Sequence, residues 1–338
     1  NAIQAGIASS SGLNIGNTGI ANLNLSSGGF NYNGALSGSG LLNVNYATAG
    51  DTLALLNASN NFTGNIALGA NGTSGVLQVY SGTFSNISDN GTGSDVTVGG
   101  GSGPASGTVV FSGPNNTYTG STTINPNFTV QAANFAGDVI NHGTLSTLGT
   151  QNSPGSLNIA GNLVSTGVIT VFVNGVTSDS YTAAGATLSG LINVKGSGTN
   201  QYAIVTTTQG ITITGTLNDP NGLTTNAATA LFSSSLSLDP TNDILLLNTT
   251  QNSLSGFAIT PNQRAVASVL DPLTQSPPPA FAPLLTTLNG LSAAQIPVAL
   301  EELTPESLQY SRMIAFENAT FMVQKVNGML GDMRSGYT

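Results

Sequence analysis

The sequence contains no cysteine and no tryptophan, only one histidine, and charged residues make up 6% of its 338 positions. Without cysteine it can form neither disulfides nor thiolate metal sites, and it has no thiol nucleophile. No run of 18 or more apolar residues occurs, so we expect no membrane-spanning helix. Five basic against fourteen acidic residues give a net charge of -9, which excludes a phosphate-neutralising surface and makes nucleic acid a poor partner.

A soluble domain normally carries about a quarter charged residues. The surface of this chain must therefore be built mainly from Ser, Thr, Asn and Gly. Disorder usually combines high net charge with few β-branched residues. Here Val, Ile, Leu and Thr are plentiful and the mean hydropathy is +0.15, so we expect a folded chain with a large core.

The composition changes near residue 260. Before Thr260 the only basic residue is Lys195 and every acidic residue is an aspartate, whereas all four Glu and all four Met follow residue 300. Glu and Met favour helices, while Asp, Asn, Gly and Thr favour turns and strands. The break predicts a long β part followed by a short α part.

The β part consists of short segments in which apolar residues alternate with Asn or Thr, the two-residue period of a strand with one buried face. Such segments occupy residues 12–16, 21–25, 41–46, 52–56, 75–80, 95–99, 107–111, 156–159, 168–173 and 210–214. Short, regularly spaced strands are typical of a sandwich, a barrel or a solenoid.

Internal similarity favours the solenoid. Residues 60–66 (NNFTGNI) and 116–124 (NTYTGSTTI) are two copies of one phrase, about 56 residues apart, which corresponds to two or three coils of ~20–25 residues. Asn suits such coils because it tolerates left-handed turns and its amide can hydrogen-bond to the Asn of the next coil. About 260 residues then predict ~11 coils and a rod about 50 Å long.

The α part carries helix signals of its own. Residues 260–263 (TPNQ) form a capping box with Pro at the first helical position, and the helix is predicted to end near Asp271 because Pro272 follows. Residues 275–279 (QSPPP) predict a stiff polyproline spacer. Ser292 and Thr304 are predicted to cap two further helices.

The last helix is predicted over residues 306–330, about 25 residues and ~37 Å long. Its apolar seam has spacings of four and three residues: Ala315, Ala319, Met322, Val326 and Met329. Charged residues interrupt the remaining surface, so the helix does not suit lipid. It suits either the polar lumen of a barrel or ordinary packing of an amphipathic helix against its neighbours.

Several phrases resemble the passenger-associated repeat of autotransporters, the proteins of type V secretion. Those that resemble the repeat lie at residues 34–44, 50–55, 61–64, 107–111 and 116–120. Those that resemble the C-terminal passenger segment, which often acts as an autochaperone, follow in order at 154–162, 171–175, 178–179, 185–190 and 202–206. Those that resemble the passenger–linker junction lie at 260–267, 270–271, 291–295, 300 and 303–306.

The resemblance implies a mainly β protein, a right-handed parallel β-helix followed by a short α-helical C-terminal segment. Residues 1–150 would be the stem, 151–260 the autochaperone-like end of the β-helix, and 261–338 a helical linker. The implied partner is the chain's own outer-membrane β-barrel translocator, through which the linker is threaded, and the implied location is the cell surface or the extracellular space of a Gram-negative-type bacterium. The sequence ends at Thr338 and contains no counterpart of the barrel. Because the sequence begins at Asn1 without a signal-type segment, we expect it to be a processed or trimmed piece.

Residues that could carry chemistry are few. His142 has no nucleophile motif beside it and is interpreted as a turn residue. Paired carboxylates for glycosidase chemistry are candidates by sequence proximity at Asp89 with Asp95 and at Asp239 with Asp243.

Three weaker signals are interpreted structurally. The segment 89–95 is similar to a calcium loop but lacks the acid of the twelfth position. The segment 99–103 (GGGSG) lacks the lysine of a phosphate loop and is interpreted as a flexible turn. Asp179, the acid best supported by the resemblance, is interpreted as a turn or capping residue.

We therefore predict no catalytic, cofactor-binding or metal-binding residue, and hypothesise a non-enzymatic surface or secreted scaffold or adhesin. Two alternatives stay open. The first is a self-assembling extracellular fibre or sheet, in which uncharged surfaces and exposed sheet edges associate into a homo-oligomer. The second is a polysaccharide-acting β-helix enzyme, which would need acids and bases clustered in a groove.

Overall fold

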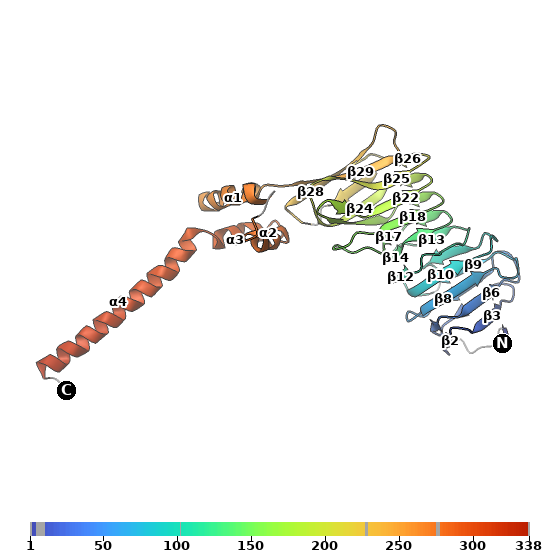
Figure 1. Cartoon of the computed structure of the whole chain (residues 1–338), viewed down its shortest axis with the longest axis horizontal. Coiled ribbons are helices and arrows are strands. Elements are labelled where there is room, and N and C mark those ends of the chain that lie inside the picture. Colours follow the sequence, from blue (N-terminus) through green and yellow to red (C-terminus); the bar gives the residue numbers. More distant parts are fainter. Residues whose placement is uncertain (1, 5–10, 102, 227–228, 275–277, 337–338) are drawn as a thin grey trace. The chain divides into compact units, whose positions relative to one another are not determined.

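The computed structural model describes the chain except residues 1, 5–10, 102, 227–228, 275–277 and 337–338. The chain divides into two compact units, the first made of residues 1–228 and 232–250 and the second of residues 229–231 and 251–338. Strands build the first unit and helices the second (Figure 1). In the residues that are described, no helix is both long and apolar enough to cross a membrane.

The first unit is a parallel β-solenoid of about nine turns. The main path of its largest sheet runs through β1 (Ala2–Gln4), β3 (Ile20–Asn24), β6 (Leu41–Asn45), β8 (Asn61–Leu68), β10 (Gly82–Ser88), β12 (Gly107–Phe111), β14 (Phe128–Ala132), β17 (Thr144–Thr147), β20 (Val168–Asn174), β24 (Gly190–Ser197) and β27 (Leu223–Asn226). Beside this path lie β2 (Leu13–Ile15), β5 (Leu36–Gly38) and β21 (Thr177–Ser178).

Two further sheets complete the solenoid. The second has nine strands, in the order β26 (Ile211–Ile213), β23 (Ala186–Leu188), β19 (Leu163–Ser165), β16 (Val139–Asn141), β13 (Thr122–Ile124), β11 (Asp95–Val98), β9 (Val76–Val79), β7 (Thr52–Leu55) and β4 (Phe30–Tyr32). The third has six, in the order β15 (Asn134–Phe135), β18 (Ser156–Ile159), β22 (Ser180–Ala183), β25 (Gln201–Thr207), β29 (Ile244–Gln251) and β28 (Phe232–Leu238).

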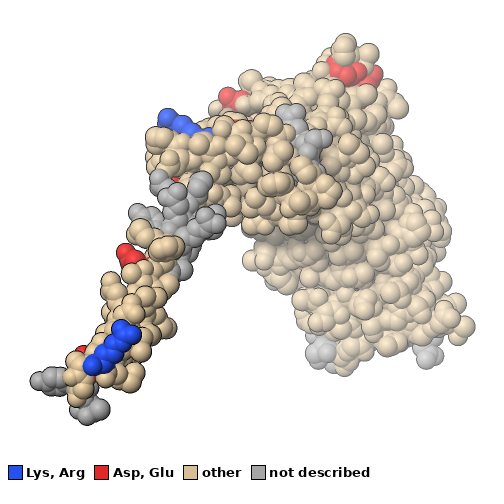
Figure 2. Space-filling view, turned by 60° about the vertical axis from the view of Figure 1, so that its left-hand side comes forward, with Lys and Arg blue, Asp and Glu red and all other residues tan. Residues whose placement is uncertain are grey.

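Parallel pairing between successive coils sets the architecture. Val139 pairs with Leu163, and Leu163 pairs with Ala186 in the following coil. Side-chain hydrogen bonds also join successive coils, for example that between Asn141 and Ser165, which are 24 residues apart. Because every strand inside a sheet is bonded on both sides, main-chain groups are satisfied without charged side chains. Consistent with this, Figure 2 displays a solenoid face on which Lys, Arg, Asp and Glu are sparse.

The interior is a continuous apolar column. Phe62, Phe84 and Phe111 occupy one register position in three successive coils and are all fully buried. The Phe111 ring also meets Phe135 edge to face, with ring centroids 5.6 Å apart. Stacked aromatic and aliphatic residues therefore bury the inward face of each coil against its neighbours, as the alternating sequence pattern predicts.

Asparagine has both of the roles predicted for it. Asn43 Nδ2 donates to Asn22 Oδ1 at 2.8 Å, and Asn45 Nδ2 donates to Asn24 Oδ1 at 2.7 Å, one coil away. Every non-glycine residue with a positive φ among those described is also an asparagine: Asn90, Asn127, Asn218 and Asn242. The short amide side chain tolerates this left-handed conformation, which most side chains avoid.

The two copies of the repeated phrase make similar local contacts. In the first copy, buried Asn60 accepts a hydrogen bond from the Leu36 nitrogen at 2.9 Å, and Phe62 enters the core. In the second copy, buried Asn116 accepts from the Ile87 nitrogen at 3.3 Å, and Tyr118 enters the core. The contacts are alike, but the places in the coil differ: Asn60 leads from β7 of the nine-stranded sheet into β8 of the largest sheet, whereas Asn116 leads from β12 of the largest sheet into β13 of the nine-stranded sheet. The phrase is therefore a local motif and does not mark one repeated coil position.

The predicted fold class is confirmed, but the predicted number of about 11 coils is wrong. The third sheet changes direction near its end, where β25 pairs antiparallel with β29. Residues 232–251 therefore close the end of the solenoid instead of adding coils to it. Strand β29 covers the edge of β25, and β28 is the last strand of the third sheet. The predicted division at residue 150 lies within the solenoid, where the first two sheets continue on both sides of it.

The second unit contains a 3-10 helix, η1 (Leu254–Gly256), and four α-helices: α1 (Pro261–Thr274), α2 (Ala282–Asn289), α3 (Gln295–Glu302) and α4 (Pro305–Ser335). The capping box is confirmed, because the Gln263 nitrogen donates to Thr260 Oγ1 at 3.2 Å and the Thr260 nitrogen donates to Gln263 Oε1 at 3.1 Å. Thr304 precedes α4, and Pro305 is its first residue, as predicted.

Three expectations for the helices need correction. Helix α1 continues past Pro272 and ends at Thr274. The Leu254 nitrogen of the 3-10 helix donates a hydrogen bond to Asp271 Oδ1 at 2.6 Å, which fixes the end of α1. Pro272 removes only one main-chain hydrogen bond, near the end of the helix. Helix α2 was not predicted at all. Ser292 lies one turn before α3, where its Oγ donates to Gln295 Oε1, and Ala294 is the N-cap.

The polyproline spacer lies largely outside the described residues, at 275–277. The last helix is longer than predicted, with 31 residues from Pro305 to Ser335. At 1.5 Å per residue its length is about 46 Å.

Close contact between coils predicts a glycine-specific effect on stability. A Cβ at Gly64 would lie 1.9 Å from the Gly40 oxygen, and a Cβ at Gly40 would lie 2.4 Å from the Gly16 oxygen. Gly64→Ala should therefore lower the free energy of unfolding by about 3 kcal/mol through forced separation of coils. Urea unfolding followed by circular dichroism measures the effect.

Gly16 provides the matched control, because a Cβ there meets nothing within 4 Å. Gly16→Ala should change stability by no more than about 0.5 kcal/mol. Equal effects of the two substitutions would contradict the close-contact argument.

Candidate functional site

The carboxylate of Asp89 is hydrogen-bonded to main-chain groups of its own turn. It accepts hydrogen bonds from the nitrogens of Gly91, Gly93 and Ser94, each at 2.9 Å, and from the nitrogen and Oγ1 of Thr119, each at 3.0 Å. Thr119 belongs to the next coil, so the side chain joins a turn to its neighbour. Burial alone would raise the pKa of Asp89, but these hydrogen bonds outweigh it and hold the pKa below its usual value.

The other predicted acid pairs have similar surroundings. Asp95 accepts from the nitrogen and Oγ of Ser121, at 2.7 and 2.9 Å. Asp239 accepts from the nitrogens of Asp243 and Ile244, each at 2.8 Å, in the turn between β28 and β29. The hydrogen bond from the Thr241 side chain is the largest of the effects that lower the pKa of Asp239. These partners are turn and coil groups, the arrangement of a structural Asx motif rather than of a paired general acid and base.

Asp179 links three segments. It is fully buried and accepts from the Gly155 nitrogen at 2.6 Å, 24 residues away, and from the Phe172 nitrogen at 3.0 Å. Burial raises the pKa of Asp179, and the hydrogen bonds from Phe172 and Gly155 offset this only in part. The predicted turn role is thus accompanied by a bridge between coils, which sequence reasoning missed because it depends on the coil step.

His142 and the glycine-rich segment also have structural surroundings. His142 Nδ1 lies 2.7 Å from Thr166 Oγ1, on the exposed surface of adjacent coils. Gly99, Gly100 and Gly101 all have positive φ, and the Tyr80 hydroxyl donates to the Gly100 oxygen. This turn, predicted to be flexible, is therefore packed against a buried tyrosine; its Ser102 lies outside the described residues. In the described part of the chain, no group of three or more His, Cys, Asp or Glu could hold a metal ion.

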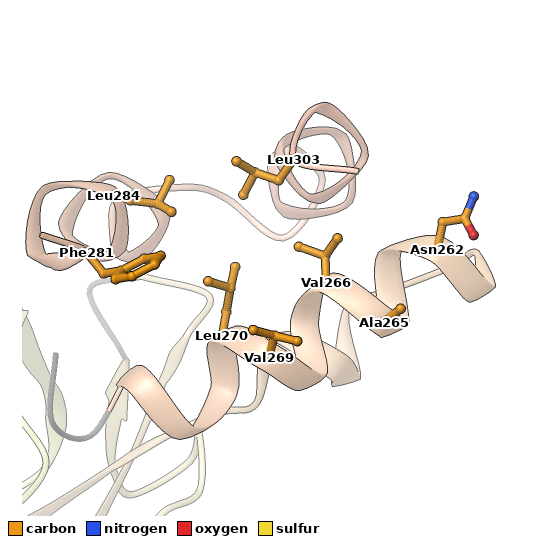
Figure 3. Close-up of a pocket in the computed structure, with 8 residues that line it drawn as sticks. All are labelled: Asn262, Ala265, Val266, Val269, Leu270, Phe281, Leu284 and Leu303. Atoms are coloured by element: carbon orange, nitrogen blue, oxygen red, sulfur yellow. The ribbon is translucent and has the colours of Figure 1, made fainter. Parts of the chain in front are cut away.

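The second unit has a small core and an exposed apolar groove. Its buried apolar side chains include Ala267, Leu270, Leu285, Ile296 and Leu300. Beside this core, α1, the start of α2 and the end of α3 enclose a groove of about 610 Å³. Figure 3 shows its apolar side chains directed toward one another: Val266, Val269, Leu270, Phe281, Leu284 and Leu303.

Sequence reasoning missed this groove because it missed α2. The spacing of Leu284, Leu285 and Leu288 carries a helical signal. A short segment after a proline-rich stretch was insufficient to establish a helix, and its partners on α1 are known only once the helices pack.

Helix α4 exposes apolar side chains along its length. The described side chains from Met313 to Ser335 are all exposed, and Phe316, Met322 and Met333 are 79%, 71% and 68% exposed. Of the predicted seam, Ala319, Met322, Val326 and Met329 are exposed, while the side chain of Ala315 lies outside the description. Exposed apolar surface of this kind is typical of an interaction site.

No family model, curated protein or solved structure has significant similarity to this chain.

The surroundings of Asp89 predict a pH-dependent contribution to stability. A folded pKa below the unfolded value of about 3.9 stabilises the protein above that pH, and this contribution is lost as the pH falls through the folded pKa. Asp89→Asn should lower the free energy of unfolding at pH 7 by about 1–3 kcal/mol, since an amide NH₂ would face donor groups. The difference from wild type should shrink below about pH 4.

Asp219→Asn is the control, because the Asp219 carboxylate accepts from the Asn221 nitrogen at 2.8 Å and an amide oxygen can accept the same bond. Its effect at pH 7 should be within about 0.5 kcal/mol. An Asp89→Asn effect that is the same at pH 7 and pH 3 would disprove the electrostatic origin.

Proposed function

We propose that this chain is the passenger and linker region of an autotransporter, a non-enzymatic scaffold or adhesin presented at the bacterial surface or released from it. Its partner would be an outer-membrane β-barrel translocator around α4. The observation that carries the proposal is the order of three elements along one chain: a β-solenoid, a small helical unit, and a 31-residue helix with exposed apolar and charged side chains. The autotransporter resemblance of the sequence assigns a role to each of them in the same order.

The length of α4 supports a linker role. At about 46 Å it exceeds the ~30 Å hydrocarbon core of a bilayer and is close to the full ~40–45 Å thickness with headgroups. Charged residues such as Glu317 and Lys325 do not suit contact with lipid. A barrel with a polar lumen would accommodate them, because its interior is lined by polar side chains and water.

The state of the carboxylates supports a structural passenger over a polysaccharide-acting enzyme. The acids proposed for catalysis, Asp89 and Asp239 among them, accept hydrogen bonds from main-chain groups of their own turns. A general acid and base must instead reach a bound substrate.

The closed end also supports a folding role for residues 151–260. A coil is stabilised mainly by its neighbours, so folding of a solenoid requires a nucleus from which coils can add. Buried Tyr202, Ile204, Leu245 and Leu247 give the antiparallel closure its own apolar contacts. This segment would fold first as it emerges and draw out the preceding coils.

Deletion of residues 151–260 tests the folding role. The remaining upstream coils should become sensitive to limited proteolysis, because they lose the segment on which they assemble. A control deletion of residues 13–111 should leave residues 151–260 resistant. Equal resistance of the upstream coils with and without residues 151–260 would refute this role.

A second experiment tests the proposed route to the surface. Fused between a signal peptide and an autotransporter barrel in a Gram-negative host, the chain should become accessible to protease added to intact cells. Without residues 305–335, the same fusion should show at least about tenfold less protease-accessible protein on intact cells, because the linker can no longer span the bilayer. Retention of both fusions inside the cell, or equal display of both, would refute the proposal.

A further inference from the structure

A second groove lies on the solenoid, on the outward side of its nine-stranded sheet. It has a volume of about 390 Å³ and crosses β16, β19, β23 and β26. Pockets of about 300–1,000 Å³ are the usual size for small-molecule ligands. The groove lies within the first unit and includes no residue of α4, the helix assigned to the translocator barrel.

One wall of the groove is polar. Asp138 and Asn162 precede β16 and β19 at the same corner of successive coils, and Gln209 lies just before β26. Asp138 is tied to its neighbour, because Asp138 Oδ1 accepts from the Asn162 nitrogen at 2.7 Å. Gly185 precedes β23, the strand between β19 and β26. A Cβ at Gly185 would lie 3.0 Å from Asn162 Oδ1 and 3.6 Å from Gln209 Cβ. Glycine at this position thus leaves the hollow open.

The other wall follows one register position along the sheet. Ile140 pairs with Val164, Val164 with Thr187, and Thr187 with Thr212. All four side chains line the groove on the outward face of the strands. Two apolar side chains are therefore followed by two hydroxyls, each one coil from the next.

This chemistry favours a ligand with both hydroxyls and apolar C–H surface. The amides of Asn162 and Gln209 can donate and accept, the hydroxyls of Thr187 and Thr212 can do the same, and Asp138 accepts. Among the described residues that line the groove there is no Lys or Arg, so an anionic ligand would meet a carboxylate and no cation there.

The strand pairing disfavours a peptide ligand. The main-chain groups of β16, β19 and β23 are paired with a strand on each side. A peptide added in the manner of an extra strand needs a free sheet edge, which these strands do not offer. Recognition must come from side chains, and an array of amides, hydroxyls and aliphatic groups is complementary to the hydroxyl rim and C–H face of a pyranose.

We propose that this groove binds a neutral polysaccharide, with the sugar chain running along the solenoid axis across the four strands. Three coil steps of about 4.8 Å give a contact length of about 14 Å, enough for a short oligosaccharide. The proposal concerns recognition without cleavage, since the described lining residues include one carboxylate, Asp138, and no second acid or base. It goes beyond the proposed role of the chain and does not depend on its route of export.

The experiment titrates the purified full chain with neutral oligosaccharides of glucose and of mannose, each in α- and β-linked form, using calorimetry or ligand-observed NMR. Polygalacturonate serves as an anionic counterpart. We expect at least one neutral sugar to bind with a Kd of about 10 mM or tighter, and polygalacturonate not to bind. No binding of any neutral sugar in this range, or binding of polygalacturonate alone, would overturn the proposal.

A matched pair of double variants locates the site. Asn162→Ala with Gln209→Ala should weaken binding at least about tenfold, because both amides of the polar wall are removed. Gln151→Ala with Asn152→Ala removes two exposed amides outside the groove and should leave binding unchanged. Circular dichroism and the melting temperature confirm that both variants fold.

Equal affinity in the two double variants would place any sugar binding elsewhere and overturn the assignment. Because the measurement uses purified protein, its failure is separate from a failure of surface display. Selectivity between α- and β-linked probes would identify the linkage that the groove accepts.

Discussion

Hydrogen bonding between the main chains of successive coils is the constraint on which the rest of this structure depends. Successive coils pair in parallel within the sheets, and a contact such as that between Asn141 and Ser165 joins two coils 24 residues apart along the chain. The inward side chains stack into a continuous core, and Phe62, Phe84 and Phe111 share one register position. This cohesion does not involve ionised groups, so a net charge of -9 with very few charged residues is compatible with a stable fold.

The few carboxylates of the solenoid reinforce the same cohesion. Asp89 and Asp179 each connect residues of different coils through main-chain nitrogens, yet their pKa values move in opposite directions. Hydrogen bonds prevail at Asp89, and burial prevails at Asp179. Both side chains are held in position by these contacts, which leaves the outward side chains of the sheets as the surfaces for recognition. The groove beside Gly185 is one such surface.

The helical unit follows a different principle. The chain there relies on capping and on small apolar contacts, such as those of Leu270 and Leu300, and α4 has exposed side chains along its described length. Single helices in water are weakly stable unless an apolar face is covered. Helix α4 is therefore the part of this unit that the proposed barrel would surround.

The sequence by itself determined the β-to-α order, the solenoid class, the positions of some strands, such as β9 and β20, and the two capping signals at Thr260 and Thr304, because alternation, turn residues and caps are local properties. The tertiary structure decided the number of coils, the antiparallel closure at β29, the path of α1 through Pro272 and both grooves. Each of these depends on which residues face one another across coils or helices. Asp138, Asn162 and Gln209 are far apart along the chain, and only the lengths of the intervening coils place them on one wall.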